Sequence, residues 1–231
     1  MLKELLAEIK KDARPARARV SQWFFKTKPG QYGHGDVFVG LTVPQMRKLA
    51  KKYEDLKLPD IQKLLKSKVH EHRFIALTIL VFRFVKSDSA EKNKIAGFYL
   101  GNTKNINNWD LVDTSAPYIL GEYLLDKSRQ ILYTLARSQD LWERRISIVS
   151  TLRFIKNNQY EDTLKISEIL LEDKHDLIHK AVGWMLREAG KKDEKVLVKF
   201  LNTHYKSMPR TALRYAIERL PIKQKKFFMA K

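Results

Sequence analysis

Cysteine is absent from this chain of 231 residues. The chain therefore cannot form a disulfide, a thiolate zinc site or a cysteine nucleophile. No apolar run is long enough to span a bilayer, and the first residues soon reach Glu8 and Lys10, which does not resemble a signal peptide. We therefore expect a cytoplasmic protein with no membrane partner.

Acidic residues are scarce relative to basic ones. The chain has 26 Asp and Glu against 45 Lys and Arg, a formal net charge of +19. An excess of this size favours phosphate backbones, because each cation that meets a phosphate releases a condensed counterion. The charge predicts a nucleic-acid partner, although a ribosome-associated protein or a basic protein without a specific partner is compatible with it.

Glycine and proline are also scarce, with 9 and 7 residues, and apolar residues recur at intervals of three and four. This pattern predicts helix almost throughout and no sheet. Hydrophobic residues make up 44% of the chain, enough for one globular domain over residues 1–231. The expected helices cover 2–12, 15–26, 43–53, 59–67, 70–86, 89–101, 108–126, 128–138, 140–157, 161–173, 176–190, 193–206 and 209–220.

One long irregular segment, from Lys26 to Leu41, contains four of the nine glycines. It runs into Thr42-Val43-Pro44-Gln45, which predicts a helix start with Thr42 as the cap and Gln45 reaching back. Backbone N–H groups of such a loop can bind a phosphate. The alternative is a connector that packs Phe38 and Val39 into the core.

An internal repeat organises the rest of the chain. Similar segments place their second members at positions 73, 109, 145 and 180, with spacings of 36, 36 and 35 residues, and a weaker copy follows at 210. Each copy opens an apolar helix that follows another helix, which is typical of an α-solenoid of HEAT-like repeats. If these helices line one basic concave wall, the second members form a stripe suited to a duplex backbone: Arg73, Trp109, Arg145, Lys180 and Arg210.

Trp109 and Asp113 are the leading candidates for chemistry. Four residues apart, they lie on one face of a helix, one turn apart. An indole face beside a carboxylate can hold a positive charge. A packing role is the alternative for Trp109, and Asp113 could instead pair with an arginine of the next repeat, such as Arg145.

Four ordered motifs carry a resemblance to a known family. They are Gly-Asp-Val-Phe-Val-Gly-Leu-Thr-Val-Pro-Gln-Met-Arg at 35–47, Asn-Trp-Asp-Leu-Val-Asp at 108–113, Leu-Trp-Glu-Arg-Arg at 141–145 and Lys-Ala-Val-Gly-Trp-Met-Leu-Arg-Glu at 180–188. They resemble the AlkD-type DNA alkylation repair glycosylases, over about residues 20–220. The resemblance implies a HEAT-like solenoid that excises cationic N3- and N7-alkylated purines from double-stranded DNA, with no metal or other cofactor.

The resemblance also assigns roles to residues. It implies that Trp109, Asp113 and Trp184 form the catalytic set, and that Arg145 and Arg187 contact the DNA backbone. Arg187 follows Trp184 by three residues, on the same helix face. Further candidates for DNA binding, each of which could instead be solvated, are Arg73, Lys180, Arg210 and Arg214.

Other aromatic and titratable residues receive structural interpretations. We expect Trp23 and Trp142 to pack ordinarily, and Trp184 shares the packing alternative. Arg144 and Arg145 are adjacent and so face different ways. The remaining expectations are surface positions for His70 and His72, no metal site at His175 and His179, and a solvated C-terminal tail at 223–226.

Three functions compete at this point. The first is a monomeric, monofunctional DNA glycosylase for cationic alkylpurines in base excision repair. The second is a non-catalytic HEAT-repeat protein that binds unusual DNA structures. The third is a solenoid scaffold for an acidic protein, which DNA binding that falls steeply with salt would oppose.

Overall fold

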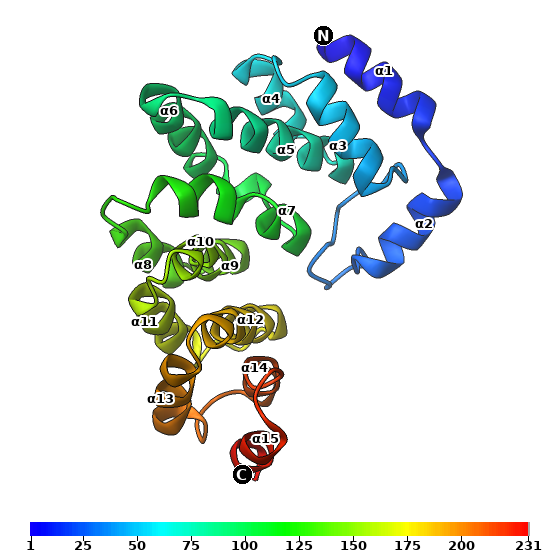
Figure 1. Cartoon of the computed structure of the whole chain (residues 1–231). Helices are drawn as coiled ribbons and strands as arrows, with labels where there is room; N and C mark the ends of the chain where they lie inside the picture. Colours follow the sequence, from blue (N-terminus) through cyan, green and yellow to red (C-terminus); the bar gives the residue numbers. More distant parts are fainter. Residues whose placement is uncertain (231) are drawn as a thin grey trace. The chain divides into compact units, whose positions relative to one another are not determined.

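The computed structural model describes residues 1–230 and divides them into two compact units, Met1–Ser115 and the chain from Ala116 onward. Helices dominate both units, and between residues 1 and 230 the only β pairing is an isolated bridge of Val37 with Val69 (Figure 1). The all-α prediction is confirmed. That the whole chain acts as one domain stays a prediction.

The first unit is built around one long buried helix, α5. Its apolar run leaves the helix hydrophobic nearly all round, so it packs against α3 and α4 together and contributes more buried apolar side chains than any other helix of this unit. The elements of this unit are α1 (Leu2–Asp12), α2 (Pro15–Phe24), α3 (Val43–Lys52), α4 (Leu58–Leu65), α5 (His70–Lys86), α6 (Ser89–Leu100), a 3₁₀ turn η1 (Thr103–Asn105) and α7 (Trp109–Asp113).

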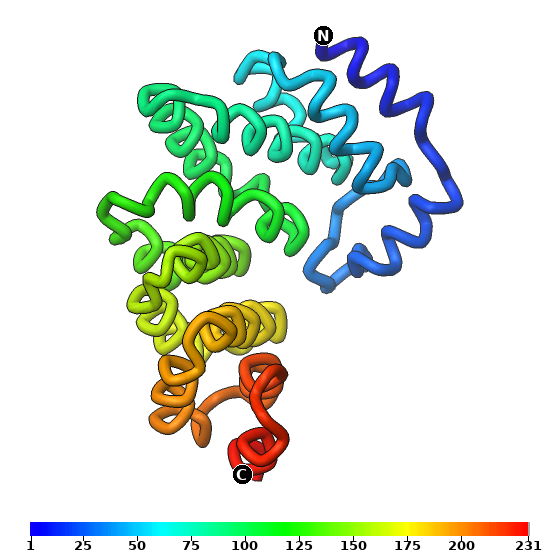
Figure 2. The backbone as a smooth tube through the Cα atoms, viewed as in Figure 1, coloured from blue at the N-terminus to red at the C-terminus, as the bar shows by residue number. Residues whose placement is uncertain are grey.

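The glycine-rich segment joins α2 to α3 as an irregular loop (Figure 2). At its far end the predicted capping box is confirmed: Thr42 Oγ1 accepts from the Gln45 N–H at 3.3 Å, and Gln45 Oε1 accepts from the Thr42 N–H at 2.8 Å. Phe38 is buried, whereas Val39 is only half-buried. The loop therefore enters the core through Phe38.

A carboxylate from α5 occupies the backbone donors of this loop. Glu71, which is buried, accepts from the N–H of Val39 at 3.1 Å and from the N–H of Gly40 at 2.8 Å. The internal anion and the capping box thus occupy the N–H groups of Val39, Gly40, Thr42 and Gln45, so a phosphate would have to displace Glu71 or the cap to bind them. The structure supports the connector interpretation.

The second unit is built around α12, which packs against α9, α11, α13 and α14. Its elements are a π-helical turn η2 (Pro117–Gly121), α8 (Gln130–Ala136), α9 (Leu141–Ser150), α10 (Leu152–Lys156), α11 (Glu161–Leu170), α12 (Asp176–Lys192), α13 (Glu194–His204), α14 (Arg210–Ala216) and α15 (Ile222–Met229). Helix pairs stacked on one another are what the repeat predicts within this unit.

Two expected helices are interrupted, and the expected tail is helical. The helix predicted over 108–126 stops after Asp113 and resumes at Pro117, whose ring and missing N–H break the hydrogen-bond ladder. The helix predicted over 140–157 breaks at Thr151, where hydroxyls bond back to carbonyls one turn earlier. Residues 223–226 belong to α15 and so do not form a tail, but Lys223 and Lys226 are exposed, as expected of a solvated segment.

Gly183 allows a close contact between α12 and α14 in the second unit. A Cβ at this position would lie 2.5 Å from the Ala212 carbonyl oxygen and 2.5 Å from the Tyr215 Cβ on α14. Gly183→Ala is therefore expected to lower the free energy of unfolding by about 1–3 kcal/mol through overpacking. Denaturant unfolding measures this loss, with Gly97→Ala as the control. A Cβ at Gly97 meets nothing within 4 Å, so the better helix propensity of alanine should stabilise the protein there. Equal effects of the two changes would refute this account of the contact.

Among residues 1–230, no helix combines the length and apolar character needed to cross a lipid bilayer.

Candidate active site

The short helix α7 carries Trp109 at its first position and Asp113 at its last. Asn108 precedes the helix as its N-cap, is fully buried, and accepts from the Trp109 N–H at 2.8 Å. The helical spacing predicted for Trp109 and Asp113 is thus confirmed. Both side chains are half-buried, so neither is sealed in the core of the first unit.

Aromatic side chains from α2 and the glycine-rich loop hold the Trp109 ring. Phe25 stacks against it at 5.3 Å between centroids, Phe24 meets it edge-on at 5.9 Å, and the indole Nε1 donates to the Tyr32 hydroxyl at 3.3 Å. Contacts from three sides restrict the rotamers of a large ring. The loop therefore serves to position Trp109.

Asp113 lies near the buried phenol of Tyr99. The Tyr99 hydroxyl hydrogen-bonds to Ser115 Oγ at 3.0 Å, and Ser115 Oγ donates to the Leu111 carbonyl at 2.5 Å. Burial raises the pKa of Tyr99 above its ordinary value, and the charge of Asp113 raises it further. Tyr99 is consequently a neutral hydrogen-bonding group beside the carboxylate throughout the physiological range.

A buried ionic network lies behind α7. His70 of α5 contacts Asp110 through Nε2 at 2.8 Å and Asp36 of the glycine-rich loop through Nδ1 at 3.2 Å. Arg73 adds an ion pair with Asp36 at 2.7 Å. One histidine thus joins α5, the loop and the residue that follows Trp109. The Asp110 Oδ1 atom is buried without a hydrogen-bond partner between residues 1 and 230.

The network keeps His70 protonated. Burial alone would lower the pKa of His70, but the Asp110 charge and the hydrogen bonds to Asp110 and Asp36 outweigh it and raise that pKa to about 9. The pKa of Asp36 is lowered: burial opposes its ionisation, but the His70 hydrogen bond and the Arg73 charge prevail. The expectation that His70 and His72 are surface groups is wrong, since His70 is buried and His72 is half-buried.

Arg73 is therefore a structural residue. Its side chain is 4% exposed, pairs with Asp36, and donates from Nη1 to the Ser67 carbonyl at 2.6 Å. A guanidinium so enclosed cannot reach a DNA phosphate without breaking a buried ion pair. We correct the predicted DNA contact of Arg73 to a role in the buried network.

In the second unit, α12 positions Trp184 and Arg187. Trp184 is half-buried beside Gly183, and its helix is anchored on α14 by the close glycine contact. Arg187, on the same face, forms an ion pair with Glu218 and lies 3.6 Å from Glu188. A phosphate would compete with Glu218 for this guanidinium, so its backbone contact stays a prediction.

Arg144 and Arg145 face different ways, as adjacent helical residues must. Arg144 pairs with Asp173 at 2.6 Å, and Arg145 donates from Nη1 to the Leu177 carbonyl at 2.5 Å in the first turn of α12. Arg145 is buried. The structure shows that it ties α9 to α12, and its contact with DNA stays a prediction.

The remaining basic candidates differ in position: Lys180 is a half-buried residue of α12, Arg210 begins α14, and Arg214 lies in the last turn of α14. Lys180 pairs with Asp176 at 2.8 Å, and the exposed Arg210 donates to the Met229 carbonyl at 3.2 Å. Arg214 is exposed and has no ion-pair partner among residues 1–230. The contacts of these three residues with phosphate stay predictions.

His175 and His179 form hydrogen bonds with backbone groups. His175 Nδ1 accepts from the Leu177 N–H at 3.1 Å as the N-cap of α12, and His179 Nε2 bonds to the Asp173 carbonyl at 2.5 Å. Over the part of the chain that the structure describes, no group of three His, Asp or Glu side chains could hold a metal ion.

Two tryptophans outside the candidate site differ from each other. Trp142 is buried, as expected, but Trp23 is 77% exposed at the end of α2, so the packing role expected for it is wrong. The sequence also gave no role to Tyr32, Phe25, Asp36 or Asp110. The motif at 35–47 and the pair Trp109-Asp110 contain two of them, but only the fold shows that they meet.

Comparison with known proteins places the site in a family. A family model described as DNA alkylation repair enzyme matches residues 5–220. The chain belongs to this family. Alkylation repair is accordingly its role, and DNA its partner. Comparison with curated proteins gave no match.

Solved structures of two proteins similar to this family member confirm the helical-repeat fold. A predicted DNA alkylation repair enzyme from Enterococcus faecalis shares 16% identity, with a TM-score of 0.71 over 91% of this chain and 98% of that one. AlkD2 from Streptococcus mutans shares 16% identity, with a TM-score of 0.55 over 95% of this chain and 99% of that one. At such identities the likeness shows the fold alone.

Proposed function

We propose that this protein is a monofunctional DNA glycosylase that excises cationic N3- and N7-alkylated purines from double-stranded DNA. The observation that carries the proposal is a half-buried indole and a carboxylate one turn apart on α7, in a chain of the DNA alkylation repair family. The monomer suffices for the reaction, because one nucleotide is the substrate.

The chemistry requires stabilisation of positive charge. An N3- or N7-alkylated purine is already cationic, so its N-glycosidic bond can break with the electron pair going to a neutral base. The deoxyribose then becomes oxocarbenium-like, and water adds to its anomeric carbon with loss of a proton. The Asp113 carboxylate would stabilise that cation and orient the water, so no general acid is needed.

Indole faces add to this stabilisation. A tryptophan face attracts a cation by about 0.5–2 kcal/mol, and by more at a dry site. The stacking of Phe25 and the hydrogen bond to Tyr32 hold the Trp109 ring before DNA arrives, which lowers the cost of ordering it. Trp184 is the proposed second ring, with Arg187 and Arg145 as proposed backbone contacts.

Selectivity would come from the lesion. A neutral purine leaves as an anion unless it is protonated, and the proposed residues include no proton donor for it. Interactions that strengthen only as positive charge moves onto the sugar speed base release from the charged lesion and have little effect on a neutral purine.

Base release from duplex DNA tests the proposal. Duplex DNA carrying N7-methylguanine is expected to release the free base on incubation with the protein, as measured by chromatography, while unmodified duplex of the same sequence releases none. Tight binding of DNA without release from N7-methylguanine or N3-methyladenine would instead support a non-catalytic protein that binds DNA structures. Competition by an acidic protein would test the scaffold function.

A further inference from the structure

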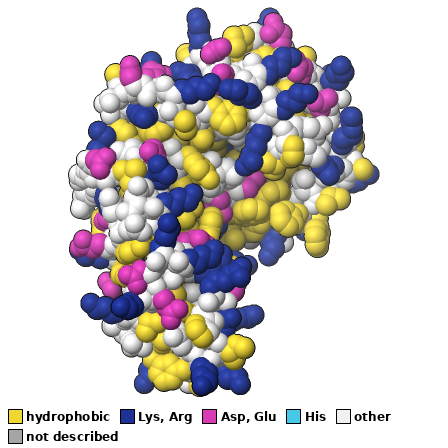
Figure 3. Space-filling view, in the orientation of Figure 1, with side chains coloured by type: hydrophobic (Ala, Val, Ile, Leu, Met, Phe, Trp, Pro, Cys, Tyr) yellow, Lys and Arg dark blue, Asp and Glu magenta, His cyan; other side chains and the backbone are white. Residues whose placement is uncertain are grey.

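The most exposed tryptophan of the chain stands at the C-terminal end of α2. Trp23 is 77% exposed, and its neighbours Phe24 and Val20 are 53% and 63% exposed. Within residues 1–230 the Trp23 side chain has no hydrogen bond and no ring contact. Figure 3 shows hydrophobic side chains gathered over this end of α2, with basic ones beside them. A large apolar surface left open to water marks a binding surface.

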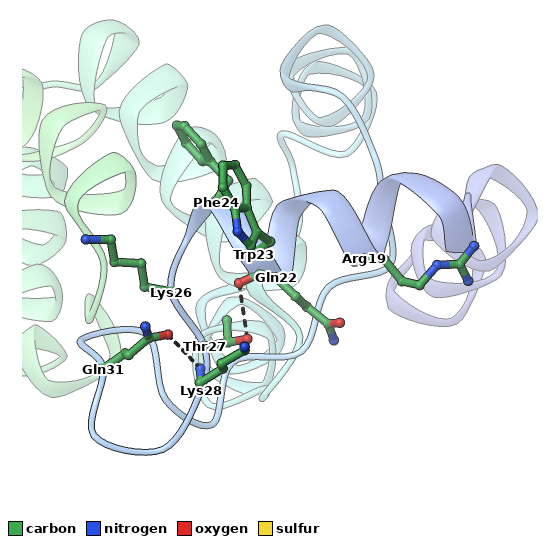
Figure 4. A pocket seen from close by; sticks show the side chains of 8 residues that line it. All are labelled: Arg19, Gln22, Trp23, Phe24, Lys26, Thr27, Lys28 and Gln31. Carbon is green, nitrogen blue, oxygen red and sulfur yellow. Dashed lines mark hydrogen bonds between the residues drawn. The ribbon is translucent and has the colours of Figure 1, made fainter.

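A cavity of about 620 Å³ opens beside this ring (Figure 4). Trp23 and Phe24 form its aromatic part, and its charged lining residues are all cations: Arg19, Lys26 and Lys28. In Figure 4, Arg19 lies to one side of the two rings and Lys26 to the other. The volume suits a small ligand or one unit of a polymer.

The three cations have no acidic partner. None of them forms an ion pair within residues 1–230, although many other basic side chains of the chain do. Unpaired cations around an aromatic face, with no carboxylate in the lining, complement a ligand that combines a flat ring with negative charge.

The cavity is held in shape by its own backbone. Lys26 adopts a left-handed conformation with φ of 53°, and its carbonyl accepts from the Gly33 N–H at 3.2 Å. Thr27 Oγ1 donates to the Gln22 carbonyl at 3.2 Å, and Gln31 Oε1 accepts from the Lys28 N–H at 3.1 Å. Gly33 is required here, because a Cβ would lie 2.3 Å from the Phe25 carbonyl oxygen. These contacts order the backbone of Lys26 and Lys28 beside the rings.

We propose that this surface, the Trp23 platform (Trp23, Phe24, Arg19, Lys26 and Lys28), binds an unpaired nucleotide of DNA. The base stacks on Trp23, and its flanking phosphates contact Lys26 and Lys28. An exposed indole can stack only on a base that has left the helical stack, and cations beside aromatic rings are the general means of holding single strands. The choice of DNA rests on the proposed function. The platform adjoins the candidate site, because Phe24 also meets the Trp109 ring edge-on, but it includes neither Trp109 nor Asp113.

Binding of fluorescein-labelled oligo(dT) of twelve nucleotides to the full chain tests the platform. Trp23→Ala is expected to weaken binding by about fivefold to a hundredfold, the effect of losing one stacked base, whereas Trp23→Phe should restore most of it. Lys26→Gln and Lys28→Gln should each lower the slope of log K against log salt by about 0.7, the single-strand value.

Phe227→Ala is the matched control. Phe227 is a 60% exposed aromatic side chain next to Lys225 and Lys226, and its removal should leave oligo(dT) affinity unchanged. Equal losses for Trp23→Ala and Phe227→Ala would overturn the proposal, since any exposed ring would then serve. Thermal unfolding should show both variants folded.

Other outcomes are equally decisive. Wild-type protein that does not bind oligo(dT), or a Trp23→Ala variant that binds it normally and loses only duplex affinity, would overturn the platform. A change in oligomeric state caused by Trp23→Ala would also overturn the platform, because the exposed ring would then form a contact between two copies of the chain. Release of the alkylated base is measured in parallel. If no base is released but oligo(dT) binding still depends on Trp23, the proposed glycosylase activity is refuted and the platform stands.

Discussion

Asp113→Asn is expected to slow release of N7-methylguanine from duplex DNA by about a hundredfold to a thousandfold, the usual effect of removing one electrostatic contact to a transition state. The amide keeps the shape of the side chain but removes the negative charge that would face the oxocarbenium-like sugar. Single-turnover release measured by chromatography reports this step without interference from product dissociation.

Asp126→Asn is the control for this charge change. Asp126 is an exposed aspartate, so its neutralisation alters net charge equally and should leave the release rate unchanged. Duplex affinity should change little in the Asp113 variant, because the expected loss concerns the transition state and not the ground state. Equal release rates for wild type and Asp113→Asn would refute the role assigned to Asp113.

His70→Ala is expected to lower the free energy of unfolding by about 3–5 kcal/mol, the usual effect of breaking a buried ion pair from one side. The substitution leaves the buried Asp36 with Arg73 alone and removes the cation beside the half-buried Asp110. It also opens a cavity beside Phe25 and Phe38, whose rings stack near the imidazole. Urea unfolding at neutral pH measures the loss.

His34→Ala provides the comparison, because His34 is exposed and its removal should change stability by less than about 0.5 kcal/mol. Base release by His70→Ala, assayed well below its unfolding transition, should also fall, since Asp110 would no longer hold the first turn of α7. Full stability and full release in this variant would show that the network does not support the site.

His70 also gives the free energy of unfolding a defined dependence on pH. Its pKa is raised from 6.5 to about 9 in the folded state, so its contribution to stability is complete below pH 6.5 and is lost as pH rises through 9. His72 acts in the opposite sense: burial and then the Arg73 charge lower its pKa to about 4, so stability falls as pH drops from 6.5 towards 4. His70→Ala should remove the alkaline loss and keep the acidic one.

The periodicity of apolar residues was enough to predict most of the helices. Helices at Leu2–Asp12 and His70–Lys86 have the predicted bounds, because strong amphipathic or apolar runs leave few alternatives. The interruptions after Asp113 and at Thr151 were missed. The first depends on a proline and the second on hydroxyl side chains. Such residues occur both within helices and at helix breaks, and the packing of neighbouring segments decides which applies.

The candidate site could likewise be predicted only in part. The motif at 108–113 was sufficient to single out Trp109 and Asp113, because a four-residue spacing on one helix is a local property. The partners of Trp109 were not predictable: Phe25 and Tyr32 come from a loop more than seventy residues away in the chain. Likewise, Trp23 and Trp142 look alike in sequence, and only the packing around them leaves one exposed and buries the other.

The sequence by itself determined the helical class, the repeat, the basic character and the family motifs, because each is set by residue type and local spacing. The tertiary structure alone decided that His70 and Arg73 form a buried network with Asp36, and that Glu71 satisfies the glycine-rich loop. The physical reason is that the burial of a charge, and the partner that compensates it, depend on which distant segments the fold brings together.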